Sequence, residues 1–377
     1  MKNYLLVLST GFALFSMFFG SGNLVFPIAV GQESHGHYLV ASLGILLTGV
    51  VVPFLGVFGM LLYRGEIASF FGCLGKTGTF LFSLFALSIM GPFGVLARCL
   101  TVAHGALQLL RPGASLIATS FVLCIAIYLL TVNKSKIVTI VGPILTPLLL
   151  LSIGAIAFFG LLDGQLAETT SARSFEVFKN GFFQGYQTMD LLAAFFFSVF
   201  ILRYLQNSSK EQGFSYSTFV KSALVGAGIL SAVYIALVML GWAYAPQLVG
   251  VPPQEMLGTI SMLALGPLAT PCVCAALVLA CLTTAIVLTS LFADFLRNEV
   301  CKTKIGNKTS LLITLAIGFM VSTLEFSGIA KFIGPILEVV YPALIVLTMV
   351  NIAHKVWGFT STHWPATVTL AAKLLWI

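Results

Sequence analysis

Long apolar runs constrain this sequence more than any other feature. Ten stretches of about twenty apolar residues follow one another, separated by short segments that hold most of the charged residues. A helix of that length spans the roughly 30 Å hydrocarbon core of a bilayer. The runs cover residues 4–30, 38–62, 79–109, 114–132, 137–162, 182–205, 217–244, 267–296, 309–324 and 329–352. They predict an all-α membrane protein.

Composition leaves little room for a soluble domain. Of 377 residues, 59% are hydrophobic and only 8% are charged, against roughly 25% charged in soluble proteins. An eleventh apolar segment begins near residue 357, but only twelve residues follow Pro365, and these cover about 18 Å as a helix. We therefore expect about eleven helices, with a partial or short eleventh over residues 353–377.

Most of the positively charged residues lie in the loops between the apolar runs. Counted over alternate loops, thirteen Lys and Arg residues lie on the side of the N-terminus and four on the other side. Short basic loops stay in the cytoplasm, so this bias predicts a cytoplasmic N-terminus. It also explains the net charge of +7 without nucleic acid, whose binders cluster basic residues on one face.

Gly-Pro pairs indicate an internal repeat. They occur in the third, fifth, eighth and tenth runs, and the sequence GPIL recurs at 142–145 and 334–337. The Gly-Pro pair of the third run corresponds to that of the eighth, and the pair of the fifth run to that of the tenth. Two halves of five helices each would give this spacing. An odd number of helices per half inverts one half relative to the other, as in many secondary transporters. We expect halves over 1–165 and 175–352, although Gly-Pro is common enough in membrane helices for chance to compete.

Two runs contain breaks that a lipid-facing helix would not tolerate. The first reads FSMFFGSGNLVFP over 15–27, and the sixth reads GFFQGYQTMD over 181–190. Each is the first run of its half, where unwound backbone forms the substrate site of such transporters. Free amides at a half-helix N-terminus suit a carboxylate, and free carbonyls at a C-terminus suit a cation. An amino acid with a co-transported cation fits both.

Structural explanations compete with this interpretation. The small residues of the first run can serve close helix packing, and Thr188 or Asp190 can cap the half-helix that follows. In the eighth run, Ala280, Thr283 and Thr284 share a helix face, where their oxygens suit sodium. The two hydroxyls can equally bond back to their own helix.

Three charged residues lie deep inside the runs, away from the run ends: Arg98, Asp190 and Glu338. Such residues are costly in a membrane and are site candidates by default. Arg98 and Asp190 can alternatively pair, which would make them structural. The sequence shows no nucleophile–base pair and no phosphate-binding loop, so neither an enzyme nor an ATP-driven pump is supported.

Several segments resemble the bacterial branched-chain amino acid carriers (the LIVCS family of the amino acid–polyamine–organocation superfamily). They are FALFSMFFGSGNLVFP, GPFGVLARCLTVAH, VGPILTPLLLL, GFFQGYQTMDLLAA, LACLTTAI and GPIL with VYPALIVL, in order from about residue 12 to 350. The resemblance implies a leucine-transporter-like fold with broken first and sixth helices. It also implies sodium-coupled symport of leucine, isoleucine and valine in the bacterial cytoplasmic membrane. The family usually has proline where this chain has Ala97, and about twelve helices.

The resemblance and the breaks together give a set of candidate residues. The substrate set is Gly20, Ser21, Gly22, Asn23, Gly185, Tyr186, Gln187 and Thr188. The resemblance implies a sodium site made of Ser16, Phe19, Ala280, Thr283 and Thr284. No organic cofactor is implied, and no sequence feature specifies an oligomeric state.

Two other mechanisms remain open at this point. A proton-coupled transporter of related fold would use Asp190 or Glu338 as its proton carrier. A channel would need a continuous pore, against which the paired breaks argue because they favour an occluded site.

Overall fold

The chain is all-helical in a computed structural model that describes residues 2–132, 137–163, 173–208, 216–358 and 369. No strand occurs among these residues. The first half contains α1 Lys2–Phe18, α2 Ser21–Gln32, α3 Tyr38–Leu46, η1 Leu47–Val51, α4 Val52–Leu62, α5 Ile67–Phe70, η2 Gly72–Leu74, α6 Gly75–Met90, α7 Val95–Leu110, α8 Leu116–Val132 and α9 Ile137–Asp163. The second half contains α10 Ser174–Tyr186, α11 Asp190–Ser208, α12 Tyr216–Ala243, η3 Pro253–Glu255, α13 Met256–Leu265, α14 Thr270–Phe295, η4 Leu296–Val300, α15 Asn307–Ser322 and α16 Glu325–Trp357.

Each predicted apolar run coincides with one helix or with consecutive helical segments. By length and composition, five described helices can cross a membrane: Tyr38–Leu62, Gly72–Leu110, Tyr216–Ala243, Thr270–Val300 and Glu325–Trp357. Taking α1 and α2 as one broken span makes six. Leu116–Val132, Pro147–Leu162 and Asn307–Ser322 are shorter apolar helices. Most of the predicted eleventh helix lies outside the described residues, as does the boundary between the predicted halves.

Both predicted breaks are present. The axes of α1 and α2 differ by 76° across a break at residues 19–20. The Asn23 Oδ1 atom accepts a hydrogen bond from the Gly20 N–H at 3.0 Å, so the third residue of α2 caps its own helix. Between α10 and α11, Met189 adopts a φ of 62° although it is not glycine. This left-handed residue turns the chain so that α11 begins at Asp190.

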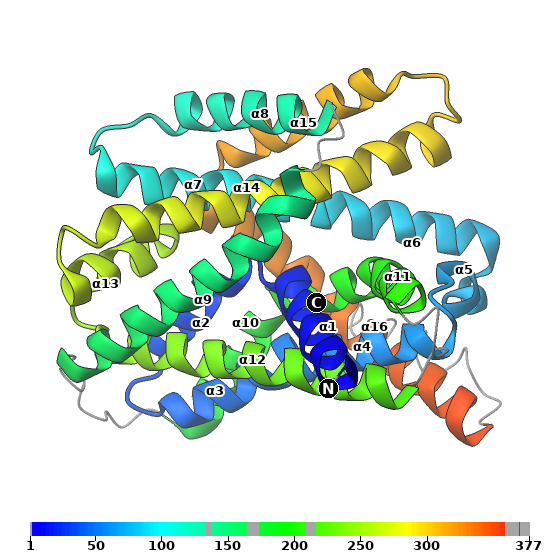
Figure 1. The fold of residues 1–377 in the computed structure, drawn as a ribbon, viewed down its shortest axis with the longest axis horizontal. Coiled ribbons are helices and arrows are strands. Elements are labelled where there is room, and N and C mark those ends of the chain that lie inside the picture. The colour runs from blue at the N-terminus through cyan, green and yellow to red at the C-terminus, as the bar shows by residue number, and fades with distance from the viewer. Residues whose placement is uncertain (1, 133–136, 164–172, 209–215, 359–368, 370–377) are drawn as a thin grey trace.

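The broken helices of the two halves have equivalent packing partners. The α1 and α2 segments both pack on α12, whereas α10 packs on α3 and α11 on α4. The first helix of each half therefore contacts the second helix of the other half, as an inverted repeat requires. Figure 1 shows α7 lying beside α14 and α8 beside α15 in a separate layer above them, and these pairs are also in contact.

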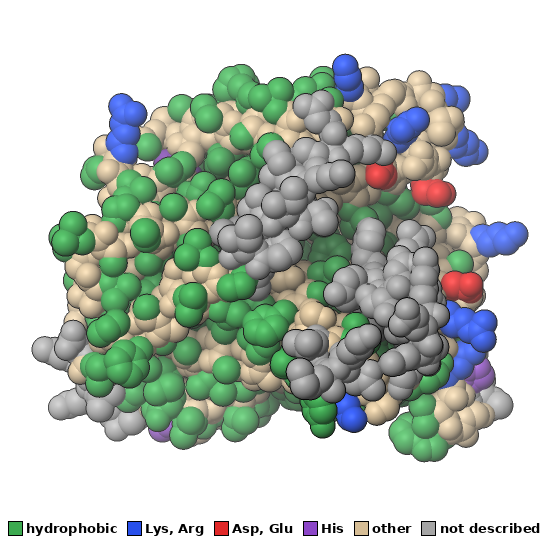
Figure 2. Space-filling model, viewed as in Figure 1, with side chains coloured by type: hydrophobic (Ala, Val, Ile, Leu, Met, Phe, Trp, Pro, Cys, Tyr) green, Lys and Arg blue, Asp and Glu red, His purple; other side chains and the backbone are tan. Residues whose placement is uncertain are grey.

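The outer surface is largely apolar. Exposed side chains include Leu151 at 71% and Leu268 at 95% of full exposure, as expected where lipid replaces water. Figure 2 shows hydrophobic side chains across the visible face, while most of the visible Lys and Arg side chains lie along the right-hand end, from the α14–α15 connection to α5. At that end the Lys355 ammonium lies 4.8 Å from the Tyr63 ring. The charge distribution along the helix axes is that of a multi-pass membrane protein.

Candidate substrate and ion site

The two breaks lie against each other in the middle of the helix bundle. A methyl group built on Gly22 of α2 would lie 3.4 Å from Cα of Thr188, which belongs to the break after α10. On its other side, the α1–α2 break meets α14, because a methyl group on Gly20 would lie 3.6 Å from Cγ2 of Thr284. Segments far apart in the sequence thus place unwound backbone in one small region.

A buried polar network joins the breaks. Asn23 Nδ2 donates to Asp190 Oδ2 at 2.7 Å and to the Tyr234 hydroxyl at 2.6 Å. The Tyr234 hydroxyl in turn donates to the same Asp190 oxygen at 3.2 Å. The three side chains are 2%, 3% and 0% exposed. Asn23 therefore caps α2 with its oxygen and holds a carboxylate with its nitrogen.

Asp190 and Arg98 do not form the pair that the sequence left open. Among the described residues, no ion pair joins the two side chains. Arg98 instead donates from Nη1 to the Gln187 carbonyl and from Nη2 to Gln187 Oε1, both at 2.7 Å. Its guanidinium carbon lies 5.0 Å from the Phe26 ring centre and 5.5 Å from that of Phe326. The two aromatic rings and the backbone and side-chain oxygens of Gln187 therefore bind the guanidinium in place of a carboxylate.

Gln187 links three helices at the base of a cavity. Its Nε2 atom donates to the Ala330 carbonyl of α16 at 3.3 Å, while Arg98 of α7 holds its oxygens. The cavity has a volume of about 300 Å³ and runs along α10 and α16. It is lined by Glu176, Lys179, Asn180, Phe183, Gln184, Gln187 and Glu338. Glu338, expected inside a span, is an exposed side chain in the wall of this cavity.

The other predicted residues of the sixth span have packing contacts. A methyl group on Gly185 would overlap the Thr48 hydroxyl, which donates to the Phe182 carbonyl at 2.7 Å. Gly185 thus permits the close approach of α10 to α3 and η1. The Tyr186 ring lies 4.8 Å from that of Tyr341. The Thr188 hydroxyl bonds to the Gly185 carbonyl at 2.9 Å.

Of the predicted sodium ligands, Thr284 lies against the first break, and Ser16 and Phe19 adjoin that break in sequence. Thr283 and Thr284 hydroxyls both donate to the Ala280 carbonyl at 3.0 Å, which is the back-bonding alternative. Each hydroxyl oxygen keeps its lone pairs for a cation, whereas both lone pairs of the Ala280 carbonyl are already engaged. Ser16 is an exposed residue whose hydroxyl bonds to the Ala13 carbonyl at 2.9 Å. The Phe19 side chain is 5% exposed.

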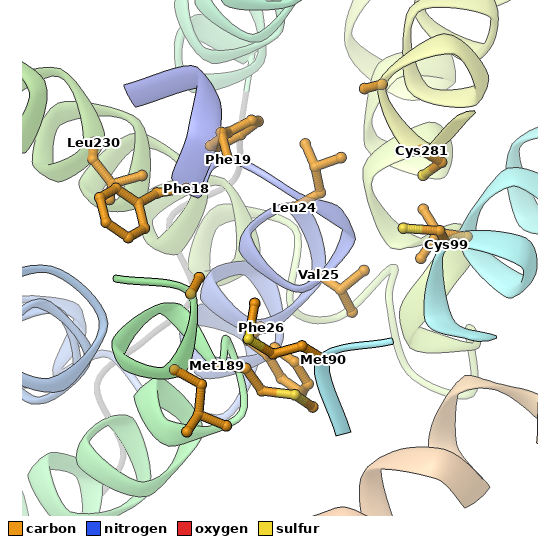
Figure 3. Close-up of a cluster of buried hydrophobic side chains, with 14 of the residues drawn as sticks. Phe18, Phe19, Leu24, Val25, Phe26, Met90, Cys99, Met189, Leu230 and Cys281 are labelled. Carbon is orange, nitrogen blue, oxygen red and sulfur yellow. The ribbon is translucent and has the colours of Figure 1, made fainter. Parts of the chain in front are cut away.

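Apolar side chains surround the breaks. Figure 3 shows Phe26 of α2 beside Met90 and Met189, while Leu24 and Val25 point toward the side of Cys99 and Cys281. These side chains are buried. Their surface is suited to an aliphatic group and offers nothing to a charged one.

Sequence reasoning missed Tyr234 and Met189. A tyrosine in the middle of the apolar run 217–244 needs a partner for its hydroxyl, and this was an available signal. The left-handed conformation of Met189 has no sequence signal, because methionine rarely adopts it.

The family model for "Branched-chain amino acid transport protein" matches residues 3–375, nearly the whole chain. The chain belongs to this family. It is 31% identical over 366 residues to the branched-chain amino acid permease BraB of Bacillus subtilis (strain 168), covering 92% of this chain and 80% of that protein. It is 27% identical over 373 residues to a Staphylococcus aureus (strain USA300) protein that bears the name of a branched-chain amino acid carrier, covering 92% and 81%.

A solved structure shares the fold. The inward-facing conformation of Mhp1 superposes with a TM-score of 0.56 at 13% sequence identity, covering 98% of this chain and 89% of that one. With the two mirrored, broken helices, this likeness confirms the leucine-transporter-like fold expected from the sequence. This member of the branched-chain amino acid transport family is therefore a multi-pass membrane protein whose broken helices meet at a buried polar network.

Proposed function

We propose that the protein imports leucine, isoleucine and valine across the bacterial cytoplasmic membrane by sodium-coupled alternating access. The observation that carries the proposal is the meeting of the two helix breaks around Asn23, Asp190 and Tyr234. Backbone N–H groups, backbone C=O groups and a buried carboxylate lie together there, surrounded by apolar side chains. A zwitterion with an aliphatic side chain is complementary to that arrangement.

The substrate carboxylate binds the amides at the N-terminus of α2, around Ser21 and Gly22, where the helix leaves N–H groups without intrahelical partners. The ammonium group binds carbonyls near Gln187 or Thr188, at the end of α10. The side chain lies against apolar residues of α2 and Met90 of α6, which are labelled in Figure 3. Gly22 serves this arrangement because a side chain there would approach the Thr188 backbone.

Sodium binds between the first break and α14. Thr283 and Thr284 supply hydroxyl oxygens, and carbonyls of Ser16 and Phe19 complete an all-oxygen set of the kind that hard cations prefer. Both hydroxyls turn from the Ala280 carbonyl, which keeps its helical hydrogen bond and gains a free lone pair for the cation. Sodium then ties α14 to the break and orders the segment that holds the substrate carboxylate.

Proton coupling is the second candidate, and Asp190 favours it. This carboxylate is 3% exposed, and its hydrogen-bond donors, Asn23 and Tyr234, are neutral. A buried charge without a counter-ion costs several kcal/mol, on the order of 3–5. A cation that neutralises Asp190 during the cycle therefore lowers the energy of the loaded state. A proton and a sodium ion can both serve.

We propose that the Arg98–Gln187 contact closes off the cavity beside α10 from the breaks. With a cytoplasmic N-terminus, α10 begins outside, so the cavity beside it faces the external solution. We propose that substrate entry requires Gln187 to leave Arg98 and the Ala330 carbonyl. Rocking of α1, α2, α10 and α11 against α7 and α14 then opens the site inward.

The test is uptake of labelled isoleucine in proteoliposomes. An inward sodium gradient is imposed at constant pH, and an inward pH gradient is imposed without sodium. Uptake driven by sodium alone supports the first candidate, and uptake driven by pH alone supports the second. Absence of competition by leucine and valine would refute the proposed substrate class.

A further inference from the structure

Two cysteines face each other beside the first break. Cys99 of α7 and Cys281 of α14 are each 1% exposed, and both line one small cavity between these two packed helices. Figure 3 shows the Cys99 and Cys281 side chains as neighbours. Cys99 Sγ also lies 3.5 Å from the Ser21 hydroxyl at the start of α2. Both cysteines are free thiols.

The surroundings of the pair are apolar. A small cavity adjoins both sulfurs, lined otherwise by Leu100, Ala103, Leu123, Ile127, Leu282 and Ala285. None of these side chains carries charge or a hydrogen-bonding group. A product bound there must be close to neutral, because a net charge in such surroundings is expensive.

Soft ligands bind sulfur, and hard cations such as sodium bind oxygen. Among thiol-seeking species, trivalent arsenic fits best. Arsenous acid, As(OH)₃, is neutral. Two thiols replace two of its hydroxyl groups: two S–H bonds and two As–O bonds break, two As–S bonds form, and two water molecules leave. No atom changes oxidation state, and the product keeps one hydroxyl on arsenic.

The preferred bond geometry favours trivalent arsenic over divalent mercury at this pair of thiols. Divalent mercury prefers a linear S–Hg–S arrangement, which holds two sulfurs apart. Arsenic holds them in a bent S–As–S arrangement, which suits two thiols that line the same small cavity. The remaining arsenic hydroxyl would lie where the Ser21 hydroxyl can hydrogen-bond to it.

We infer that Cys99 and Cys281 form a two-thiol binding site for trivalent arsenic. The site bridges α7 and α14 next to Ser21, whose amide belongs to the proposed carboxylate site. Bound arsenic would therefore block transport, and this consequence alone rests on the proposed function. Binding itself depends only on the two thiols.

The primary test uses purified full-length protein in detergent, treated with sodium arsenite in excess glutathione and then desalted. Wild type should retain about one arsenic per chain by elemental mass spectrometry, because the second As–S bond forms within the molecule and adds about 10²–10⁴ in avidity. Cys99→Ser and Cys281→Ser should each lose this retention. Cys124→Ser, a buried cysteine on α8, is the matched control and should keep it.

A second variant controls for the possibility that the single substitutions fail to fold. A protein that keeps Cys99 and Cys281 but has the other five cysteines replaced should retain arsenic like wild type. Retention by Cys99→Ser, or none by wild type, would overturn the site. If isoleucine uptake is absent from the start, the proposed function fails while arsenic retention still decides the site. If arsenic is retained and uptake continues unchanged, the blocking role is wrong.

Discussion

Replacing Asp190 by asparagine separates the charge of the central network from its shape. The two side chains have almost the same volume, and the amide oxygen of the new side chain can accept the same bonds from Asn23 and Tyr234, now 2.7 and 3.2 Å long. The substitution removes the negative charge that we assign to neutralisation by the coupling cation. We expect a protein that folds normally but no longer couples uptake to that cation.

The structure sets the magnitudes. Two charge-assisted hydrogen bonds of about 1.5–3 kcal/mol each become neutral ones of about 0.5–1.5 kcal/mol. The loss, about 2–3 kcal/mol in all, is offset by removal of an unpaired buried charge that costs about 3–5 kcal/mol. The variant should therefore be at least as stable as wild type. A cation about 4 Å from the carboxylate loses about 4 kcal/mol at an effective dielectric constant near 20, close to a thousandfold in affinity.

Thermal unfolding in detergent measures the stability, and uptake against sodium concentration and pH measures the coupling. Glu338→Gln is the matched control, because Glu338 lines the outer cavity rather than the network. It should leave the dependence of uptake on cation concentration close to that of wild type. An Asp190→Asn protein that retains the wild-type dependence on both cations would refute the reasoning.

Three further predictions address other parts of the structure. Thr283→Ala with Thr284→Ala should raise the sodium concentration needed for half-maximal uptake at least about tenfold, and a normal sodium curve would rule out that site. Gly185→Ala should lower the unfolding temperature, because the added methyl overlaps the Thr48 hydroxyl and overpacking costs about 1–3 kcal/mol; unchanged stability would show that α10 can move freely from η1. In the loop between α12 and α13, burial, with the charge of Glu325 second, raises the pKa of Glu255. The ionised carboxylate therefore destabilises the fold, so Glu255→Gln should unfold at a higher temperature than wild type at pH 8. The difference in unfolding temperature should vanish as the pH falls through the raised pKa toward 4.5. An equal difference at pH 8 and at pH 4.5 would contradict this.

The helices and both breaks were predictable from the sequence because each has a local cause. Lipid demands about twenty apolar residues per span, and Gly20 or Asn23 in such a run has no favourable contact with lipid. The breaks therefore followed from residue type alone. The expectation that the two breaks lie together followed from the repeat.

The partners within the site were not predictable. Helix α12 is apolar around most of its circumference, so its sequence does not reveal that Tyr234 faces Asp190. The same is true of Arg98, whose choice between Asp190 and Gln187 depends on how α7 is rotated about its axis. The thiol pair has no motif, because Cys99 and Cys281 lie in different halves.

The most direct test of the account is the uptake of labelled isoleucine by proteoliposomes that contain the purified protein, with and without an inward sodium gradient at constant pH. We expect a sodium gradient to drive accumulation above the external concentration, with excess leucine or valine suppressing it. Accumulation that is unchanged when sodium is removed would contradict sodium coupling.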